Sequence, residues 1–438
     1  MERVQRNLLR VLRDDARVTR LSTLVEASAD ARRLVPEGVD VHEVNGLDEA
    51  LAALRPPRAA DRPDVYHLTF FADRRPTDLL LLAAANASVL SVTDAILNRH
   101  PEYHRSEREH AAYDRFTRAL VQHSDRVVSF SESAKREAID DLGAAEGNVD
   151  VASLAVDPGM ASPLSAEQVT LRTRAMGVAG RWVLLVGKDY PHKDHAAAIE
   201  AMANQADDVG MVVAGERVWH QPLPGGHTFE GLVRARGLES RVHRITSAND
   251  EDLKALYQGA VALVYPSREE GFGLPPLEAM ALGLPVVTTT AMSIPEVVGD
   301  AALTSPSGDA VALSVNLGRV IGDEAVREDL AARGRKRASE FSWTRVADGV
   351  VDGYRRAITG AEKRGDVPPR DAPAMLDMLD VIASYPFKDA GEIAAWKERA
   401  REIEVDFRGL EEKYRALQAA VPRWSLRRRW RKLTGRWK

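Results

Sequence analysis

The stretch Pro266-Ser-Arg-Glu-Glu-Gly-Phe-Gly-Leu-Pro-Pro-Leu-Glu278 places two carboxylates around a glycine turn that opens a helix. The apolar run 261–265 before it predicts a buried strand. Pro275 and Pro276 suit the first turn of a helix, where backbone N–H groups lack intrahelical partners. We therefore expect a strand, a turn and a helix N-terminus that offers donors to an anion such as a diphosphate.

The glycines and glutamates of this stretch predict a sugar-binding turn. Gly271 and Gly273 let the backbone approach a ligand closely. Glu270 and Glu278 lie at opposite ends of the turn, where carboxylates accept hydrogen bonds from sugar hydroxyls. A strand, a turn and an acidic helix also occur in many α/β proteins, so the turn alone leaves a purely structural role open.

A second strand-to-helix turn carries two lysines. The apolar strand 182–186 runs into Gly187 and Lys188, and Lys193 follows just before a helix that we expect to begin near His195. Two cations in one such loop converge on an anion more readily when a helix N-terminus adds its partial positive charge. We expect Lys188 and Lys193 to clamp a diphosphate; the alternative is a pair of solvated lysines.

Taken together, the two turns resemble those of the family-4 retaining glycosyltransferases. The signature of that family is two glutamates separated by seven residues, a spacing that Glu270 and Glu278 fit, preceded in the chain by a glycine and lysine turn. The resemblance implies an α/β fold of the GT-B type, with two facing, doubly wound, Rossmann-like domains. Here a C-terminal helical tail follows them.

The resemblance also implies roles for individual residues. It makes Lys188, Lys193 and Glu270 the catalytic group, with the lysines on the leaving pyrophosphate and the glutamate on the hexose. It implies that the donor is bound by Gly187, Ile245, Phe272, Gly273, Leu274 and Glu278. In this assignment Glu278 holds the ribose hydroxyls and Ile245 flanks the nucleobase, although an apolar residue there could equally belong to the core. The nucleotide-diphosphate sugar is a co-substrate, and neither a cofactor nor a metal is expected.

The acceptor side departs from the family pattern. Thr93 and Asp94 stand where many relatives have a histidine and an aspartate, so Thr93 replaces the residue usually near the reacting sugar. Whether Asp94, His100 or His67 takes its place is open at this point. Relatives also begin with a strand and a glycine-rich loop, whereas this chain starts in the helix marked by Val4. We therefore expect either a start site further upstream or one strand and one phosphate contact fewer.

Alternating strands and helices predict parallel, doubly wound sheets whose ligands lie beyond the carboxyl ends of the strands. At 438 residues the chain is long enough for two such domains. We expect an acceptor-side domain at 1–160, a nucleotide-sugar domain at 161–358, a linker at 359–390, a coiled-coil-like helix at 391–421 and a basic amphipathic tail at 422–438.

Composition favours a cytoplasmic protein. The chain has no cysteine, no signal-peptide pattern and no apolar run long enough to cross a bilayer. Its net charge of -5 includes eight basic and no acidic residues within 423–438, so the remainder is strongly acidic. This asymmetry argues against a general nucleic-acid binder and predicts a separate partner for the tail.

Two patterns in the tail predict interactions. Apolar residues at steps of three and four over 393–421 predict a coiled coil and a possible homodimer; a single amphipathic helix is the alternative. Within 423–438, tryptophans and leucines share one helical face among basic residues. This pattern predicts binding to an anionic membrane surface, at the inner face of the membrane. Nucleic-acid binding and a solvated tail are the rival interpretations.

We expect a retaining glycosyltransferase that moves a hexose to a glycan or lipid-linked acceptor in cell-surface polysaccharide or glycolipid synthesis. Two alternatives remain at this point. One is a nucleotide-sugar epimerase on the same fold, and the other is a non-catalytic, membrane-associated scaffold.

Overall fold

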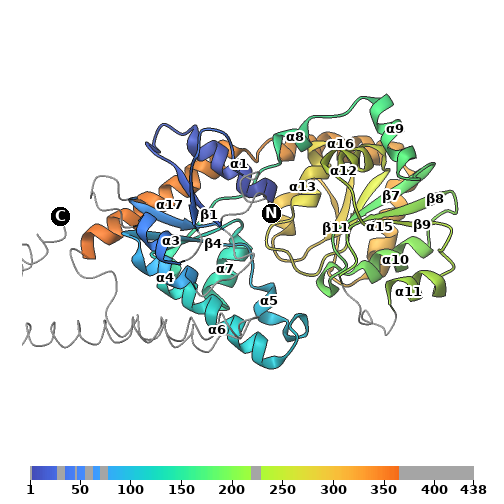
Figure 1. Cartoon of the computed structure of the whole chain (residues 1–438). Coiled ribbons are helices and arrows are strands. Elements are labelled where there is room, and N and C mark those ends of the chain that lie inside the picture. The colour runs from blue at the N-terminus through green and yellow to red at the C-terminus, as the bar shows by residue number, and fades with distance from the viewer. Residues whose placement is uncertain are drawn as a thin grey trace, which may run out of the picture.

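A computed structural model describes residues 2–26, 35–44, 47–54, 63–69, 77–218 and 228–364. The described chain forms two α/β lobes that lie side by side (Figure 1). The predicted coiled-coil-like helix at 391–421 and the basic tail at 422–438 fall outside the described residues, as does most of the predicted linker.

The C-terminal lobe contains a parallel six-stranded sheet with the strand order β12-β11-β10-β7-β8-β9. Its strands are β7 Arg181–Val186, β8 Val209–Ala214, β9 Val242–Ile245, β10 Ala262–Tyr265, β11 Val286–Thr289 and β12 Leu303–Ser305. Its helices are α9 Ala166–Ala175, α10 His195–Ala203, α11 Phe229–Ala235, α12 Asp250–Gly259, α13 Leu274–Ala281, α14 Ile294–Val298, α15 Ala310–Gly322 and α16 Glu324–Ala338. The doubly wound domain expected here is confirmed.

Strand alternation divides the core of this lobe between two faces. Val183 and Leu185 pack with α10 and α15 on one face, whereas Leu184 packs with α12 and α13 on the other. Successive side chains of a strand point to opposite faces, and both faces of a parallel sheet are covered by helices. The apolar run of β7 is therefore buried on both sides, which explains why it lacks a polar alternation.

The N-terminal lobe divides its described strands between two parallel sheets. One joins β1 Ser22–Glu26 to β2 Asp40–Val44, and the other has the order β3-β4-β5-β6. The second sheet consists of β3 Val65–Leu68, β4 Ala87–Val92, β5 Arg126–Ser129 and β6 Val149–Val151. The helices here are α1 Glu2–Arg13, α3 Leu47–Leu54, α4 Thr77–Ala84, α5 Ile96–Arg99, α6 Glu107–His123, α7 Glu132–Asp140 and, at the crossing to the other lobe, α8 Pro158–Ala161.

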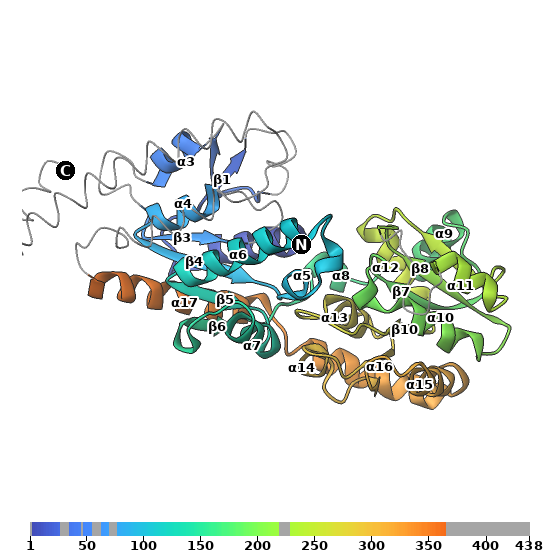
Figure 2. The same ribbon diagram turned by 90° about the horizontal axis from the view of Figure 1, so that it is seen from below.

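A long final helix, α17 Trp343–Arg364, begins at the C-terminal lobe and returns to the N-terminal one. It packs against α1, β4 and β5, and Figures 1 and 2 both show it lying along the N-terminal lobe. Trp343 donates its indole N–H to the carbonyl of Val156 at 2.9 Å, where the chain crosses between lobes. The boundary predicted at residue 358 therefore cuts through α17, and 359–364 is helix, not linker.

Within the described ranges, no helix combines the length and apolar character that a membrane crossing requires.

The lobes approach each other closely at Gly271. A Cβ atom added to this glycine would lie 2.1 Å from the carbonyl oxygen of Thr93, which belongs to the opposite lobe. No side chain fits that gap, since real Cβ atoms do not come so near a backbone oxygen. The glycine at this position is thus required for the two lobes to meet as they do.

We expect Gly271→Ala to separate the lobes locally and lower the free energy of unfolding by about 1–3 kcal/mol, the usual cost of overpacking. Urea denaturation measures this loss. Gly147→Ala is the matched control, because its added Cβ meets nothing within 4 Å. Equal stability of the two variants would contradict the contact.

Candidate active site

The lysine turn and the glutamate turn follow β7 and β10, which are neighbouring strands of the C-terminal sheet. Their carboxyl ends meet at one edge, where open α/β sheets bind ligands. The lysine turn ends in α10, which begins at His195 as expected, and the glutamate turn ends in α13. Gly273 caps α13 with a φ of 106°, a conformation that favours glycine.

Hydrogen bonds join the two turns into one unit. The backbone N–H of Arg268 donates to the carbonyl of His192 at 2.7 Å. The Arg268 guanidinium donates to Asp194 at 2.7 Å, and Asp194 in turn caps α10 by accepting from the N–H of Ala197. These hydrogen bonds fix the position of the lysine turn relative to the glutamate turn.

Glu270 is held as an anion by three groups. Lys193 Nζ and the Tyr265 hydroxyl each lie 2.5 Å from its Oε1, and the Ser267 hydroxyl lies 2.7 Å away. Burial disfavours the charged form, but the Lys193 ammonium and these hydrogen bonds outweigh it and lower the pKa of Glu270. No donor among the described residues contacts Oε2, which leaves this oxygen available to a sugar hydroxyl.

The backbone of the glutamate turn offers further donors. The N–H groups of Phe272, Gly273 and Leu274 have no acceptor among the described residues. The Ser293 hydroxyl lies 2.8 Å from the carbonyl of Glu270 and 2.9 Å from that of Phe272, which fixes the turn from behind. These N–H groups stand at the N-terminus of α13, where negative charge is favoured.

The two lysines do not contact the same group. Lys193 binds Glu270, whereas Lys188 pairs with Glu216 at 2.7 Å and is more than half exposed. Glu216 reaches Lys188 because the preceding Gly215 lies against the lysine turn, where an added Cβ would be 2.0 Å from the carbonyl oxygen of Gly187. The expected clamp is thus not formed in this structure, and an incoming anion would have to draw Lys188 away from Glu216.

Both oxygens of Glu278 are occupied. The Tyr257 hydroxyl donates to Oε2 at 3.0 Å, and Arg3 Nη2 lies 3.1 Å from Oε1. Burial raises the pKa of this carboxyl, against the opposing effect of the Arg3 charge. Ile245, expected to flank a nucleobase, is buried in the apolar core together with Val212, which is the structural role that the sequence left open.

Thr93 and Asp94 lie against the glutamate turn, and their acceptor-side role stays a prediction. The carbonyl of Thr93 faces Gly271, and Asp94 lies near enough to Lys193 and Glu270 to feel both charges. Burial raises the pKa of Asp94, and its carboxylate accepts a hydrogen bond from the N–H of Ile96 at 3.1 Å. Asp94 is therefore the polar side chain that the N-terminal lobe brings to the lysine–glutamate pair.

Neither of the two candidate histidines joins this pair. His67 lies 2.8 Å from the Tyr354 hydroxyl and 2.9 Å from that of Ser91, and burial lowers its pKa to about 3, so it is neutral and held by these two hydroxyls. His100 instead contacts the opposite lobe: its Nε2 lies 2.5 Å from Glu269 Oε1. The expectation that either could replace the family's histidine is not supported by these contacts.

His100 belongs to a charged cluster between the lobes, which we call the clasp: Arg99, His100 and Glu269. Arg99 donates to Glu269 Oε2 through Nη2 at 2.7 Å and Nε at 3.1 Å. It also donates to Asp141 at 2.7 Å within its own lobe. Glu269 directly precedes Glu270, so the clasp ties the N-terminal lobe to the glutamate turn.

Several residues of the site were not singled out from the sequence. Tyr265 and Ser267 lie within five positions of Glu270, so their hydroxyls could have been found by asking what neutralises a buried carboxylate. Arg3 and Arg99 carry no such signal, because they lie far from the glutamates in the sequence. Only the fold brings them together.

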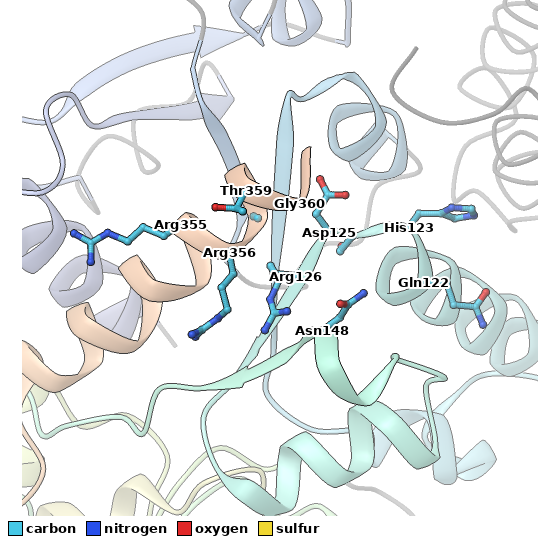
Figure 3. Close-up of a pocket in the computed structure, with 11 residues that line it drawn as sticks. Gln122, His123, Asp125, Arg126, Asn148, Arg355, Arg356, Thr359 and Gly360 are labelled. Atoms are coloured by element: carbon cyan, nitrogen blue, oxygen red, sulfur yellow. The ribbon is translucent and has the colours of Figure 1, made fainter. Parts of the chain in front are cut away.

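A cavity of about 720 Å³ lies elsewhere, between the end of α6, the start of β5 and the end of α17 (Figure 3). The cavity lies at the amino end of β5 in the N-terminal lobe, whereas the two turns lie at the carboxyl ends of strands in the C-terminal lobe. Arg126 and Arg356, which line it, both bind Asp150. No cluster of three metal-ligating side chains occurs within the described ranges, and the expectation of a metal-independent site stays a prediction.

Residues 179–337 match the family described as "Glycosyl transferases group 1". Among curated proteins, the O-antigen chain mannosyltransferase B of Escherichia coli is 34% identical over 178 residues, which cover 40% of this chain and 45% of the relative. The MMP alpha-(1->4)-mannosyltransferase of Mycolicibacterium hassiacum is 33% identical over 237 residues, covering 53% and 54% of the two chains. The matched segments thus span about half the length of these relatives.

Solved structures match over most of the described chain. Anabaena HepE in complex with UDP and glucose aligns with a TM-score of 0.62 at 18% identity, covering 80% of this chain and 94% of that one. WaaG, a glycosyltransferase involved in lipopolysaccharide biosynthesis, aligns with a TM-score of 0.55 at 16% identity, covering 79% and 93%. Residues 179–337 are therefore a domain of the glycosyl transferases group 1, within a chain that has the GT-B fold.

Proposed function

We propose that the chain is a retaining glycosyltransferase that moves a hexose from a nucleotide-diphosphate sugar to a glycan or lipid-linked acceptor. The observation that carries this proposal is the Lys193–Glu270 pair at the start of α13. Glu270 is held ionised through Oε1, and no donor among the described residues contacts its Oε2. The N–H groups of the same turn have no acceptor within the described residues. A sugar hydroxyl and a diphosphate would each find their partners there.

In this proposal catalysis depends on positioning and charge. The bond between the anomeric carbon and the phosphate oxygen breaks while the acceptor hydroxyl attacks from the same face. The hydroxyl proton passes to the departing phosphate oxygen, whose negative charge Lys193 and the α13 N-terminus stabilise. Such preorganised charge stabilises the transition state, and the mechanism needs no protein nucleophile.

The names of the relatives support a hexosyl transfer in glycan synthesis. The two relatives described above are mannosyltransferases, one acting on an O-antigen chain, and WaaG takes part in lipopolysaccharide biosynthesis. None of these proteins is named as an epimerase or as a scaffold, so neither alternative gains support. The geometry of the pocket selects the hexose and the nucleobase, and the two-glutamate motif does not.

The clasp has a place in the proposed reaction. Transfer requires the acceptor, held by the N-terminal lobe, to reach the sugar held by Glu270. From that lobe, Arg99 and His100 form ion pairs with Glu269, the residue next to Glu270 in the sequence. The clasp thereby fixes the distance between the two halves of the site.

For the tail we propose attachment to an anionic membrane surface through 423–438, as its basic and aromatic composition favours. Attachment would bring a peripheral, cytoplasmic enzyme to a lipid-linked acceptor. Pairing of two chains through 393–421 is proposed on the same footing, from its apolar repeat.

Glu270→Gln should lower hydrolysis of the preferred nucleotide sugar about 100-fold or more, because the amide cannot hold Lys193 by charge. Lys193→Ala should do the same. A panel of UDP-, GDP- and ADP-hexoses, with released nucleotide as the readout, measures both effects. Glu239→Gln, an exposed change remote from the turns, is the control, and unchanged turnover in the two site variants would rule out the proposal.

The clasp should make stability depend on pH. Burial opposes protonation of His100, but Glu102 and Glu269 outweigh it and raise its pKa; Arg99 and His100 likewise hold the pKa of Glu269 below its usual range. The His100 contribution is then fully present below its ordinary pKa of about 6.5 and lost as pH rises through the raised value. Thermal unfolding should show a deficit for His100→Gln at pH 6 that disappears by pH 9.

His243→Gln is the matched control, since this exposed histidine bonds only to a backbone carbonyl among the described residues. A deficit for His100→Gln that is the same at both pH values would show that the His100 charge adds nothing to the clasp.

Sedimentation with vesicles containing anionic lipid tests the tail. The full chain should sediment with these vesicles and lose binding in high salt, because charge drives the attachment. A chain ended after Val421 should stay in solution. Undiminished sedimentation of the shortened chain would rule out the tail as the anchor.

A further inference from the structure

Arg3 reaches from one lobe into the site of the other. Its helix, α1, belongs to the N-terminal lobe, where Val4 and Leu8 are buried beside α17. Figure 1 shows the N-terminus at the junction of the two lobes. The Arg3 side chain crosses this junction to Glu278 on α13, a contact between residues far apart in the sequence.

The Arg3 contact is a nearly buried ion pair. Nη2 lies 3.1 Å from Glu278 Oε1 and Nε lies 3.6 Å from Asp250, while the Glu278 side chain is only 5% exposed. A carboxylate taken out of water is costly unless a cation and hydrogen bonds compensate it. Tyr257 supplies one hydrogen bond, and Arg3 supplies the charge.

Two carboxylates near Glu278 disfavour its ionised form: Asp250 from α12 and Asp157 before α8. Burial itself adds to this effect. The Tyr257 hydrogen bond favours the ionised form but adds no positive charge. Arg3 from α1 is the cation that opposes burial and the two carboxylates.

The start of α1 is also anchored where the chain crosses between lobes. Asn7 donates to Asp157 at 2.6 Å, and Arg6 lies 3.5 Å from the same carboxylate. Asp157 in turn caps α8, the first helix after the crossing. The position of Arg3 therefore follows the relative position of the two lobes.

We propose that the donor site is completed by both lobes, with Arg3 as a positioning residue that orients the Glu278 carboxylate to accept the ribose hydroxyls of the nucleotide. This inference rests on the proposed function. It adds that a side chain of the N-terminal lobe sets the donor affinity, even though the turns that contact the donor belong to the other lobe.

Calorimetric titration of the full chain with UDP, GDP and ADP tests the role of Arg3. For the nucleotide that binds to the wild type, Arg3→Ala should show an affinity about 10- to 100-fold weaker, because Glu278 then loses the cation that holds and compensates its carboxylate.

Three variants sharpen this test. Arg10→Ala, on the same helix but bonded only to Asn7 in the described chain, should bind as wild type does. Arg3→Lys, which keeps the cation, should restore most of the affinity. In a Glu278→Gln background, Arg3→Ala should have no further effect, because Arg3 acts through the Glu278 carboxylate.

Each other outcome overturns the inference. Weaker binding of Arg3→Ala that persists in the Glu278→Gln background would mean that Arg3 contacts the nucleotide itself, and tighter binding would mean that Arg3 competes with the ribose. Unchanged binding would mean that the ion pair only joins the lobes. Failure of the wild-type chain to bind any of the three nucleotides would instead overturn the proposed function, and this inference with it.

Discussion

The ion pair between Lys193 and Glu270 is the contact on which the rest of the site depends. It joins the turn after β7 to the turn after β10, and it places the positive charge where the N–H groups of α13 also point. Tyr265 and Ser267 complete the shell around the same carboxylate oxygen. Because Glu270 is compensated on one oxygen, the other is left to a ligand without the cost of an unpaired buried charge.

The same requirement for charge compensation shapes the contacts between the lobes. Glu269 is neutralised by Arg99 and His100, and Glu278 by Arg3, each supplied by the opposite lobe. Gly271 lets the backbones approach between these two points. Around the glutamate turn the lobes thus meet through polar groups, beside an apolar cluster that includes Val4 of the N-terminal lobe and Leu277 of the other lobe.

Much of the C-terminal lobe could be predicted because its signals are local. The apolar runs that became β7 and β10, the prolines that start α13 and the start of α10 were all found within a residue or two. The N-terminal lobe was harder: β1 and β2 pair apart from the main sheet, and most of β2 is exposed, so its apolar signal is weak. The return of α17 to that lobe was missed, since an amphipathic helix does not reveal which sheet will cover its apolar face.

By itself the sequence determined the alternation of strands and helices, the two turns and the carboxylates and lysines that they carry, because spacing along the chain sets all of these. Only the tertiary structure decided which charges meet. It paired Lys188 with Glu216 and brought Arg3 to Glu278. It also placed His67 between Tyr354 and Ser91, and His100 in the clasp. Electrostatic partners are chosen by distance in space, and residues far apart in the sequence become neighbours only when the two lobes have folded and met.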